Sequence, residues 1–275
     1  MSSRPILPSL FVPHGAPSFA LRPGAAGAAL VRTAASLPRP RAVIIVSAHW
    51  DTRQVTVGLA DRLETIHDFW GFPRELYALN YPATGCKEAG AELLARLQAA
   101  GIAALGDDQR GLDHGAWIPL QLMFPDADVP VIPLSIQTHL GPSHHLAIGR
   151  ALAPLVAEGF LILASGNLTH SLRDFQLVSV QGKAVPGYVR EFADWVWQRL
   201  EAGDVAALLA YRASAPDAVR AHPSEEHLLP LYVALGAAGD GYRAERLHAG
   251  VDDYVLAMDA FAFHQNHTPT QPRQT

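Results

Sequence analysis

Several histidines follow buried, strand-like runs of the chain. His14 follows the run LFVP, His49 lies at the end of AVIIVSAHW, His170 ends LILASGNLTH, and His139 ends VIPLSIQTH. In open α/β sheets, ligands bind at the carboxyl ends of the strands. Neutral imidazole binds zinc and non-haem iron, and it also titrates near neutral pH. These positions predict a metal or acid–base site at one sheet edge, although a single strand-end histidine is more commonly a loop residue bound to a backbone carbonyl.

Three further segments combine polar and aromatic side chains with glycine and proline. They are TIHDFWGFPRELYALNYPATG, GLDHGAWIPLQLMFPDADVP and HPSEEHLLPLYVALGAA. Their residues with possible chemistry are His67, Asp68, Phe69, Arg74, Tyr81, His114, Glu226 and His227. Each segment also has a purely structural interpretation: an aromatic surface loop, a capped helix start, and acids placed favourably at a helix N-terminus.

The elements that position these residues alternate between short β-branched runs and longer Ala/Leu-rich stretches of helical period. This alternation indicates an α/β fold in which the strands are buried on both faces of a parallel or mixed sheet. The expected strands are 9–13, 42–48, 55–59, 129–136 and 160–164. The expected helices are 25–36, 87–100, 143–158, 187–202, 204–212, about 223–235 and 254–263. His139, His144 and His145 lie in or beside a helix start, where solvated or capping roles are expected.

Composition excludes several classes of protein. The 275 residues are 49% hydrophobic and 17% charged, with a formal net charge of −5, which argues against disorder and against nucleic acid or an anionic membrane as partner. Cys86 is the single cysteine, so an internal disulfide is excluded. No apolar run reaches the length of a membrane span, and the N-terminus does not resemble a signal peptide. We therefore expect a cytoplasmic protein with one domain over 1–265 and a polar, disordered tail over 266–275.

Six stretches, in order from residue 11 to residue 239, resemble the class III extradiol ring-cleaving dioxygenases, in particular the 4,5-DOPA extradiol dioxygenase branch. The stretches are FVPHGAPS, VIIVSAHW, TIHDFWGFPRELYALNYPA, GLDHGAW with PDADVPVIPLSIQ, ASGNLTHSLR, and HPSEEHLLPLYVALGAAG. Members of this family cleave the aromatic ring of a catechol with O2. The resemblance implies a single α/β domain with a central mixed sheet flanked by helices, and a metal site at the strand carboxyl ends.

The resemblance also implies one divalent metal ion, Fe(II) in active enzyme, with Zn(II) able to occupy the same site. Its ligands would be His14, His49 and His227. The wider class uses a glutamate as third ligand, and Glu226 adjoins His227, so the spacing alone leaves the third ligand open.

By the same resemblance, His170 would be the acid/base and His114 a further catalytic histidine beside the metal. His170 could also ligate the metal in a resting form. The residues that would bind a DOPA-like catechol are His67, Phe69, Arg74 and Tyr81. The alternative functions are a zinc-dependent hydrolase that uses the same histidines and a non-catalytic binding protein with this fold. The physiological catechol, the cleavage position and the oligomeric state stay open.

Overall fold

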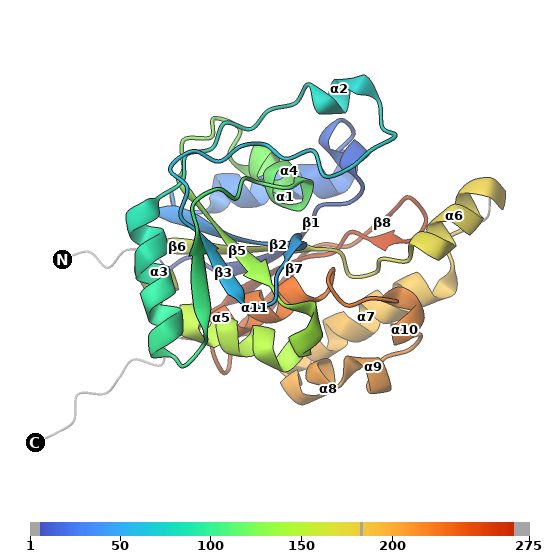
Figure 1. Ribbon diagram of the computed structural model, residues 1–275. Coiled ribbons are helices and arrows are strands. Elements are labelled where there is room, and N and C mark those ends of the chain that lie inside the picture. The colour runs from blue at the N-terminus through green and yellow to red at the C-terminus, as the bar shows by residue number, and fades with distance from the viewer. Residues whose placement is uncertain (1–5, 182–183, 267–275) are drawn as a thin grey trace, which may run out of the picture.

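A computed structural model describes residues 6–181 and 184–266 of the chain. An eight-stranded mixed sheet forms its centre, in the strand order β4-β3-β5-β2-β6-β1-β10-β7, with helices on both faces (Figure 1). The strands are β1 Ser9–Pro13, β2 Ala42–Asp51, β3 Val55–Gly58, β4 Ala104–Asp107, β5 Val131–Ile136, β6 Phe160–Gly166, β7 Arg243–His248 and β10 Ala260–His264, with β8 Val251–Asp252 and β9 Leu256–Ala257 in a separate hairpin. The predicted single α/β domain with a mixed sheet is confirmed. The predicted tail, apart from Asn266, lies outside the described residues.

The middle of the sheet is parallel. β2 pairs with both β5 and β6, and β6 pairs with β1, all in the parallel sense. These strands are rich in Val, Ile and Leu and are buried on both faces, which is typical of strands covered by helices on each side. Because the four strands run in one direction, their carboxyl ends meet at one edge, where His14 and Asn167 directly follow β1 and β6 and His49 lies near the end of β2.

The helices cover the two faces of the sheet. α1 and α4 pack on one face with Leu10, Val43 and Ile45, while α3, α5 and α11 pack on the other with Ile44 and Val46. The helices are α1 Gly24–Ser36, α2 Arg74–Tyr77, α3 Lys87–Ala99, α4 His114–Met123, α5 Gly141–Ala157, α6 Leu172–Gln181, α7 Gly187–Ala202, α8 Val205–Leu209, α9 Tyr211–Ser214, α10 Ala218–Ala221 and α11 Leu229–Ala237, with short 3-10 turns at Pro17–Ala20 and Thr138–Leu140. Within 6–181 and 184–266, no helix is both long enough and apolar enough to cross a membrane.

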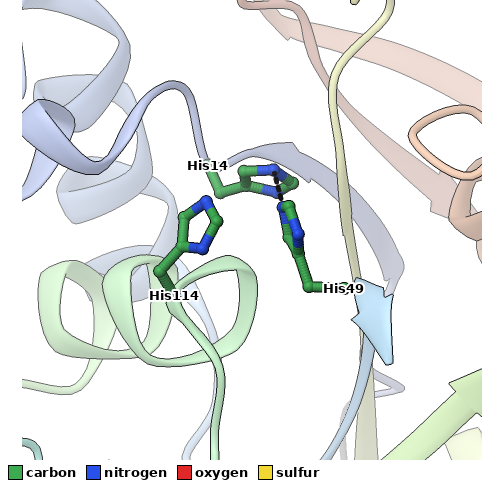
Figure 2. A group of neighbouring side chains, drawn as sticks. All are labelled: His14, His49 and His114. Atoms are coloured by element: carbon green, nitrogen blue, oxygen red, sulfur yellow. Dashed lines mark hydrogen bonds between the residues drawn. The ribbon is translucent and has the colours of Figure 1, made fainter. Parts of the chain in front are cut away.

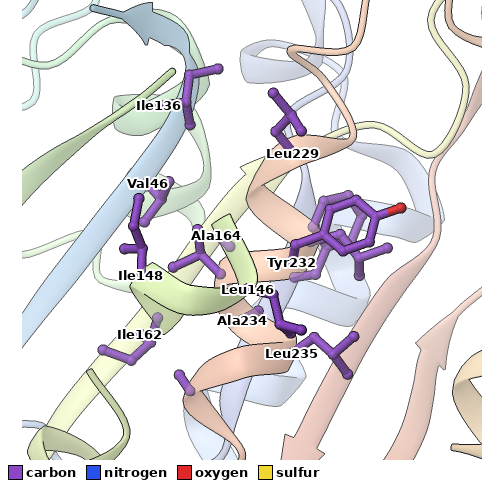
Figure 3. Close-up of a cluster of buried hydrophobic side chains, with 14 of the residues drawn as sticks. Val46, Ile136, Leu146, Ile148, Ile162, Ala164, Leu229, Tyr232, Ala234 and Leu235 are labelled. Atoms are coloured by element: carbon purple, nitrogen blue, oxygen red, sulfur yellow. The ribbon is translucent and has the colours of Figure 1, made fainter. Parts of the chain in front are cut away.

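α11 is buried on every side, between the sheet and α5 (Figure 3). A Cβ on Gly149 of α5 would lie 2.2 Å from the Val233 carbonyl oxygen, and one on Gly236 would lie 2.3 Å from the Leu146 carbonyl oxygen. The backbones of α5 and α11 are therefore in contact at Gly149 and Gly236, where there is no side chain to separate them. This packing fixes the start of α11, and His227 lies two residues before it.

Several predicted elements need correction. The helix expected over 254–263 is wrong, because this stretch forms β9 and β10. β10 is paired on both edges, with β1 and β7, and its side chains pack into the core on both faces of the sheet, so its run of apolar residues is not distinguishable from a buried helix by periodicity. The helix expected from about 223 begins only at Leu229, and the one expected over 204–212 is divided into α8 and α9.

His145 belongs to the core and is not solvated. Its side chain is fully buried in α5, its Nδ1 donates to the Gly141 carbonyl oxygen at 2.7 Å, and its Nε2 accepts from the Gln137 backbone N–H at 3.1 Å. Both ring nitrogens are thus used by the neutral form, in which only Nδ1 carries a proton. Burial is the main cause that lowers the pKa of His145, to about 4.

This lowered pKa predicts a loss of stability in mild acid. The unfolded chain binds a proton at His145 below pH 6.5, whereas the folded chain does so only near pH 4, so stability falls as the pH drops through this window. The contribution reaches about 2 kcal/mol by pH 5. In urea unfolding at pH 7 and pH 5, a His145→Gln variant should therefore show a smaller decrease than the parent. His139→Gln, which removes an exposed histidine nearby, should behave like the parent. Equal decreases in all three proteins would contradict this account.

Candidate metal centre

Five histidines from separate parts of the chain meet at the carboxyl edge of the sheet. Figure 2 shows His14, which follows β1, His49 in β2, and His114 at the start of α4, with their rings directed toward one another. The Nε2 atoms of His14 and His49 are 3.1 Å apart, and the His49 and His114 ring centres are 4.1 Å apart. The ring of His227 lies 5.3 Å from that of His14 and 5.0 Å from that of His49, and the ring of His170 stacks on His227 at 3.5 Å.

The tautomer of His14 follows from its surroundings. The Ser165 hydroxyl donates to the Gly115 carbonyl oxygen, so it can only accept from His14 Nδ1, which lies 3.0 Å away. His14 Nδ1 therefore carries the proton, and the Nε2 lone pair faces His49. The following Gly15 has a φ of +61°, which turns the chain sharply away from the sheet and leaves the His14 side chain at its edge.

His49 is presented by an irregularity in β2. The pairing of β2 with β5 shifts register between Val46 and Asp51, so the residues between them have no regular partner on β5. Bulges of this kind re-aim side chains and occur beside active sites. The His49 backbone N–H donates to the Ser47 hydroxyl, which in turn donates to the Asp113 carboxylate. The bulge is thus held against the start of α4.

His114 is the first residue of α4. The Asp113 carboxylate caps this helix by accepting from the Ala116 backbone N–H at 3.1 Å. The Asp68 carboxylate accepts from both nitrogens that His114 offers on this side, the backbone N–H at 2.8 Å and Nδ1 at 3.0 Å. In the neutral ring, His114 Nε2 is therefore unprotonated and carries a lone pair.

His227 lies in the turn before α11. Its Nδ1 donates to the Glu226 carboxylate at 3.2 Å, while its Nε2 is buried and has no hydrogen-bond partner among the described residues. The backbone around it is fixed by Asn167, whose N–H donates to the His227 carbonyl oxygen at 3.0 Å. A buried imidazole nitrogen without a partner is costly unless something binds it, and a metal ion satisfies this requirement.

Burial keeps four of these imidazole rings neutral. Burial, reinforced by the neighbouring histidines, lowers the pKa of His14 and of His227 well below the ordinary 6.5. Burial also lowers the pKa of His49 to about 4 and that of His170 to about 3. Burial alone would raise the pKa of Asp68, but its hydrogen bonds and charge interaction with His114 lower this pKa to about 2. The result is that His14, His49, His170 and His227 are unprotonated, with the ionised Asp68 carboxylate beside His114 and His49.

These donors fit a divalent ion of the zinc or iron kind. Imidazole nitrogens lie about 2.0–2.1 Å from bound zinc, so two adjacent ligands of one ion are roughly 3.0–3.4 Å apart, as His14 Nε2 and His49 Nε2 are. The residues His14, His49 and His114 each offer a ligand atom within 4.8 Å of the others, and so do His170, Glu226 and His227.

The residues predicted to bind the substrate lie around an aromatic segment, 66–73, beside this cluster. The Phe69 ring is 5.8 Å from His114, and His67 packs against Phe69 while its Nε2 donates to the Leu79 carbonyl oxygen at 3.0 Å. Arg74 begins α2 and is exposed. Tyr81 is buried in the core, and its hydroxyl donates to the Phe124 carbonyl oxygen at 3.0 Å. The exposed His139, in contrast, does not join the cluster.

Sequence reasoning gave no role to three polar residues that hold the histidines in place. They are Asp68, Ser165 and Asp113. A local signal exists only for Asp113, which precedes a helix start in the pattern of an N-cap.

Comparison with known proteins identifies the chain. A family model described as the catalytic LigB subunit of aromatic ring-opening dioxygenase matches residues 25–258. The chain belongs to this family. It is an extradiol ring-cleaving dioxygenase, which opens the ring of a catechol with O2, and the resemblance inferred from the sequence is confirmed.

Its relatives cover nearly the whole dioxygenase. A 4,5-DOPA dioxygenase extradiol from Beta vulgaris is 38% identical over 259 residues, 93% of this chain and 96% of its own length. A protein of the same name from Escherichia coli K12 is 37% identical over 238 residues, 84% of this chain and 85% of its own. The crystal structure of an uncharacterized protein from Escherichia coli K12 superimposes with a TM-score of 0.76 at 29% identity, covering 93% of this chain and 99% of that one.

The close contact between α4 and His49 predicts the effect of a single methyl group. A Cβ on Gly115 would lie 2.8 Å from His49 Cδ2 and 2.6 Å from Ser47 Oγ, so Gly115→Ala should displace the His49 ring. We expect zinc affinity to fall about 10–100-fold, measured by competition with a chelator. Gly187→Ala, whose new Cβ meets only the flexible end of Glu191, is the matched control. Unchanged affinity in Gly115→Ala would mean that His49 does not bind the ion.

Proposed function

We propose that this dioxygenase uses Fe(II) to cleave a DOPA-like catechol, with His14, His49 and His227 as the metal ligands. The observation that carries the proposal is the meeting of His14 Nε2 and His49 Nε2 at 3.1 Å, near the buried, partnerless Nε2 of His227 and beside the aromatic segment 66–73. Relatives at 36–38% identity named 4,5-DOPA dioxygenase extradiol support the substrate class. Fe(II), when bound, supplies the redox chemistry that links catechol and dioxygen, which zinc lacks.

The choice of His227 as third ligand rests on hydrogen bonding. Glu226 already accepts from His227 Nδ1 and from the Ser224 hydroxyl. A carboxylate behind an imidazole fixes the ring and raises the basicity of its other nitrogen, as is common around metal-bound histidine. The partnerless His227 Nε2 is then free for the ion. His114, held by Asp68, stays available for the substrate or oxygen, and the two hydroxyl oxygens of a catechol can bind the ion together on the side that three protein ligands leave open.

His170 is the proposed acid/base. Its ring stacks on His227, with planes inclined by only 8°, so it is held beside the ion. Because its pKa is low, it is unprotonated at neutral pH and can accept a hydroxyl proton from the catechol and return it later in the reaction. His114 is the proposed second catalytic histidine.

The proposed substrate pocket uses the aromatic segment. Phe69, whose ring contacts His114, would stack against the catechol, and His67 supports Phe69 from behind. Arg74 is exposed and cationic, which suits the carboxylate of an amino-acid side chain. Because Tyr81 is buried in the core and its hydroxyl is bound to Phe124, Tyr81 would support the pocket from the core side and not contact the catechol itself.

Oxygen uptake tests the proposed activity. Protein reconstituted anaerobically with Fe(II) should consume O2 and form a yellow product with L-DOPA, whereas zinc-loaded protein should do neither. A panel of simple catechols would map the preference for the side chain. If iron is bound and no catechol supports uptake, the proposed substrate class is wrong, and a zinc-dependent hydrolase or a non-catalytic binding protein becomes the better interpretation.

Substitution separates the ligands from the acid/base. His170→Ala should lower kcat by about 10²–10⁴-fold and retain iron at the parent's level, whereas His14→Ala should lose the iron itself. Iron content is measured by elemental analysis after gel filtration. His139→Ala, which alters an exposed histidine outside the cluster, is the control for both. If His170→Ala loses iron as His14→Ala does, His170 is a ligand.

A further inference from the structure

Asp68 connects the aromatic segment to the metal centre. From 66–73 its side chain reaches His114, 46 positions along the chain, and one carboxylate oxygen, Oδ1, accepts both the His114 backbone N–H at 2.8 Å and His114 Nδ1 at 3.0 Å. The other oxygen, Oδ2, lies 3.7 Å from His49 Nδ1. Asp68 therefore faces two imidazoles of the cluster from the side of their Nδ1 atoms.

A carboxylate in this position determines the tautomer of His114. An ionised carboxylate can only accept hydrogen bonds, so His114 Nδ1 carries a proton, and in the neutral ring Nε2 presents its lone pair to the site. Because the backbone N–H and Nδ1 of His114 both donate to Asp68 Oδ1, these two bonds also define the rotation of the His114 ring. A catechol hydroxyl beside the ion would then find an acceptor at His114 Nε2.

Contacts other than those of Asp68 also hold this part of the fold together. α4 already has its N-terminal cap in Asp113. The aromatic segment is separately attached to α4, because Trp117 Nε1 donates to the Ile66 carbonyl oxygen at 3.2 Å and the Ile66 N–H donates to the Leu112 carbonyl oxygen at 2.7 Å. The Asp68 contacts with His114 are thus additional to those that hold these elements together, which points to a role in the reaction.

We infer that Asp68 is a positioning residue, which acts through His114 by fixing its orientation and its Nδ1–H tautomer so that Nε2 accepts a hydrogen bond from the catechol. The inference rests on the proposed function. It extends that function by assigning a task to a residue which contacts neither the ion nor the substrate.

Two substitutions at Asp68 distinguish position from charge. Asp68→Asn keeps an oxygen that can accept both bonds from His114 but removes the negative charge. Asp68→Ala removes the acceptor. Asp61→Asn changes an exposed aspartate in the same connection between β3 and α2, for which no side-chain bond is found within the described residues, and serves as the control.

The tautomer is measured without turnover. In full-length, zinc-loaded protein labelled with ¹⁵N-histidine, imidazole nitrogen shifts should show the Nδ1–H form of His114 in the parent, in Asp68→Asn and in Asp61→Asn. Asp68→Ala should show the Nε2–H form or a mixture. Retention of the parent tautomer in Asp68→Ala overturns the inference, and so does an Nε2–H form in the parent. This readout stands whether or not DOPA is the substrate.

Kinetics test whether Asp68 acts through His114. With iron-loaded protein, Asp68→Ala should lower kcat about 10–100-fold with iron content and KM near the parent's, and Asp68→Asn should recover most of the loss. In a His114→Ala background, Asp68→Ala should cause no further loss, because two residues that act as one unit are not additive. A full additional loss in the double variant, or an Asp68→Asn enzyme as slow as Asp68→Ala, overturns the inference. If the parent itself is inactive, the proposed function fails instead, and the tautomer measurement still decides the role of Asp68.

Discussion

Buried imidazoles that must stay unprotonated are the constraint on which this site depends. Burial disfavours the imidazolium form, so each ring keeps one N–H and one lone pair, and the N–H needs an acceptor. Ser165 provides it for His14, Asp68 for His114 and Glu226 for His227. Each acceptor binds Nδ1 of its ring, so in the neutral form the Nε2 of each of these three rings is left with its lone pair. The hydrogen bonds made by the Nδ1 atoms thus determine that Nε2 is the nitrogen available to bind an ion or a proton.

The parallel sheet makes this arrangement possible. Since β1, β2 and β6 run side by side in one direction, His14, His49 and the 167–171 segment leave the sheet at one edge. His227 joins them from the other layer because α11 is buried against the sheet, and because Gly166 lets the His227 carbonyl oxygen approach within 2.1 Å of where its Cβ would be. The core packing that stabilises α11 is therefore also what places the proposed third ligand.

The sequence predicts the part of this that is local. Strand ends mark His14, His49 and His170, and the alternation of strands with helices, which indicates parallel pairing, is enough to predict that they meet at one edge. The same rules fail where tertiary context decides: β10 has the composition of a buried helix, and the 223–228 stretch forms only turns, in which the Glu225 carbonyl oxygen accepts from the Leu228 N–H while the His227 carbonyl oxygen accepts from Asn167 next to β6. His145 lies at a helix start and yet is fully buried, since periodicity at a helix end does not reveal what packs over it.

The partners of the histidines are beyond local rules. Ser165 and His14 are 151 positions apart, and Asp68 and His114 are 46 apart, so no sequence spacing connects each pair.

The placement of the carboxylates also has a consequence for the charge of the site. In the proposed site the carboxylates lie behind the rings and contribute no charge directly to the ion, whereas a glutamate ligand would cancel one unit. Three neutral ligands, as proposed, would leave the full positive charge of the ion available to attract a deprotonated catechol.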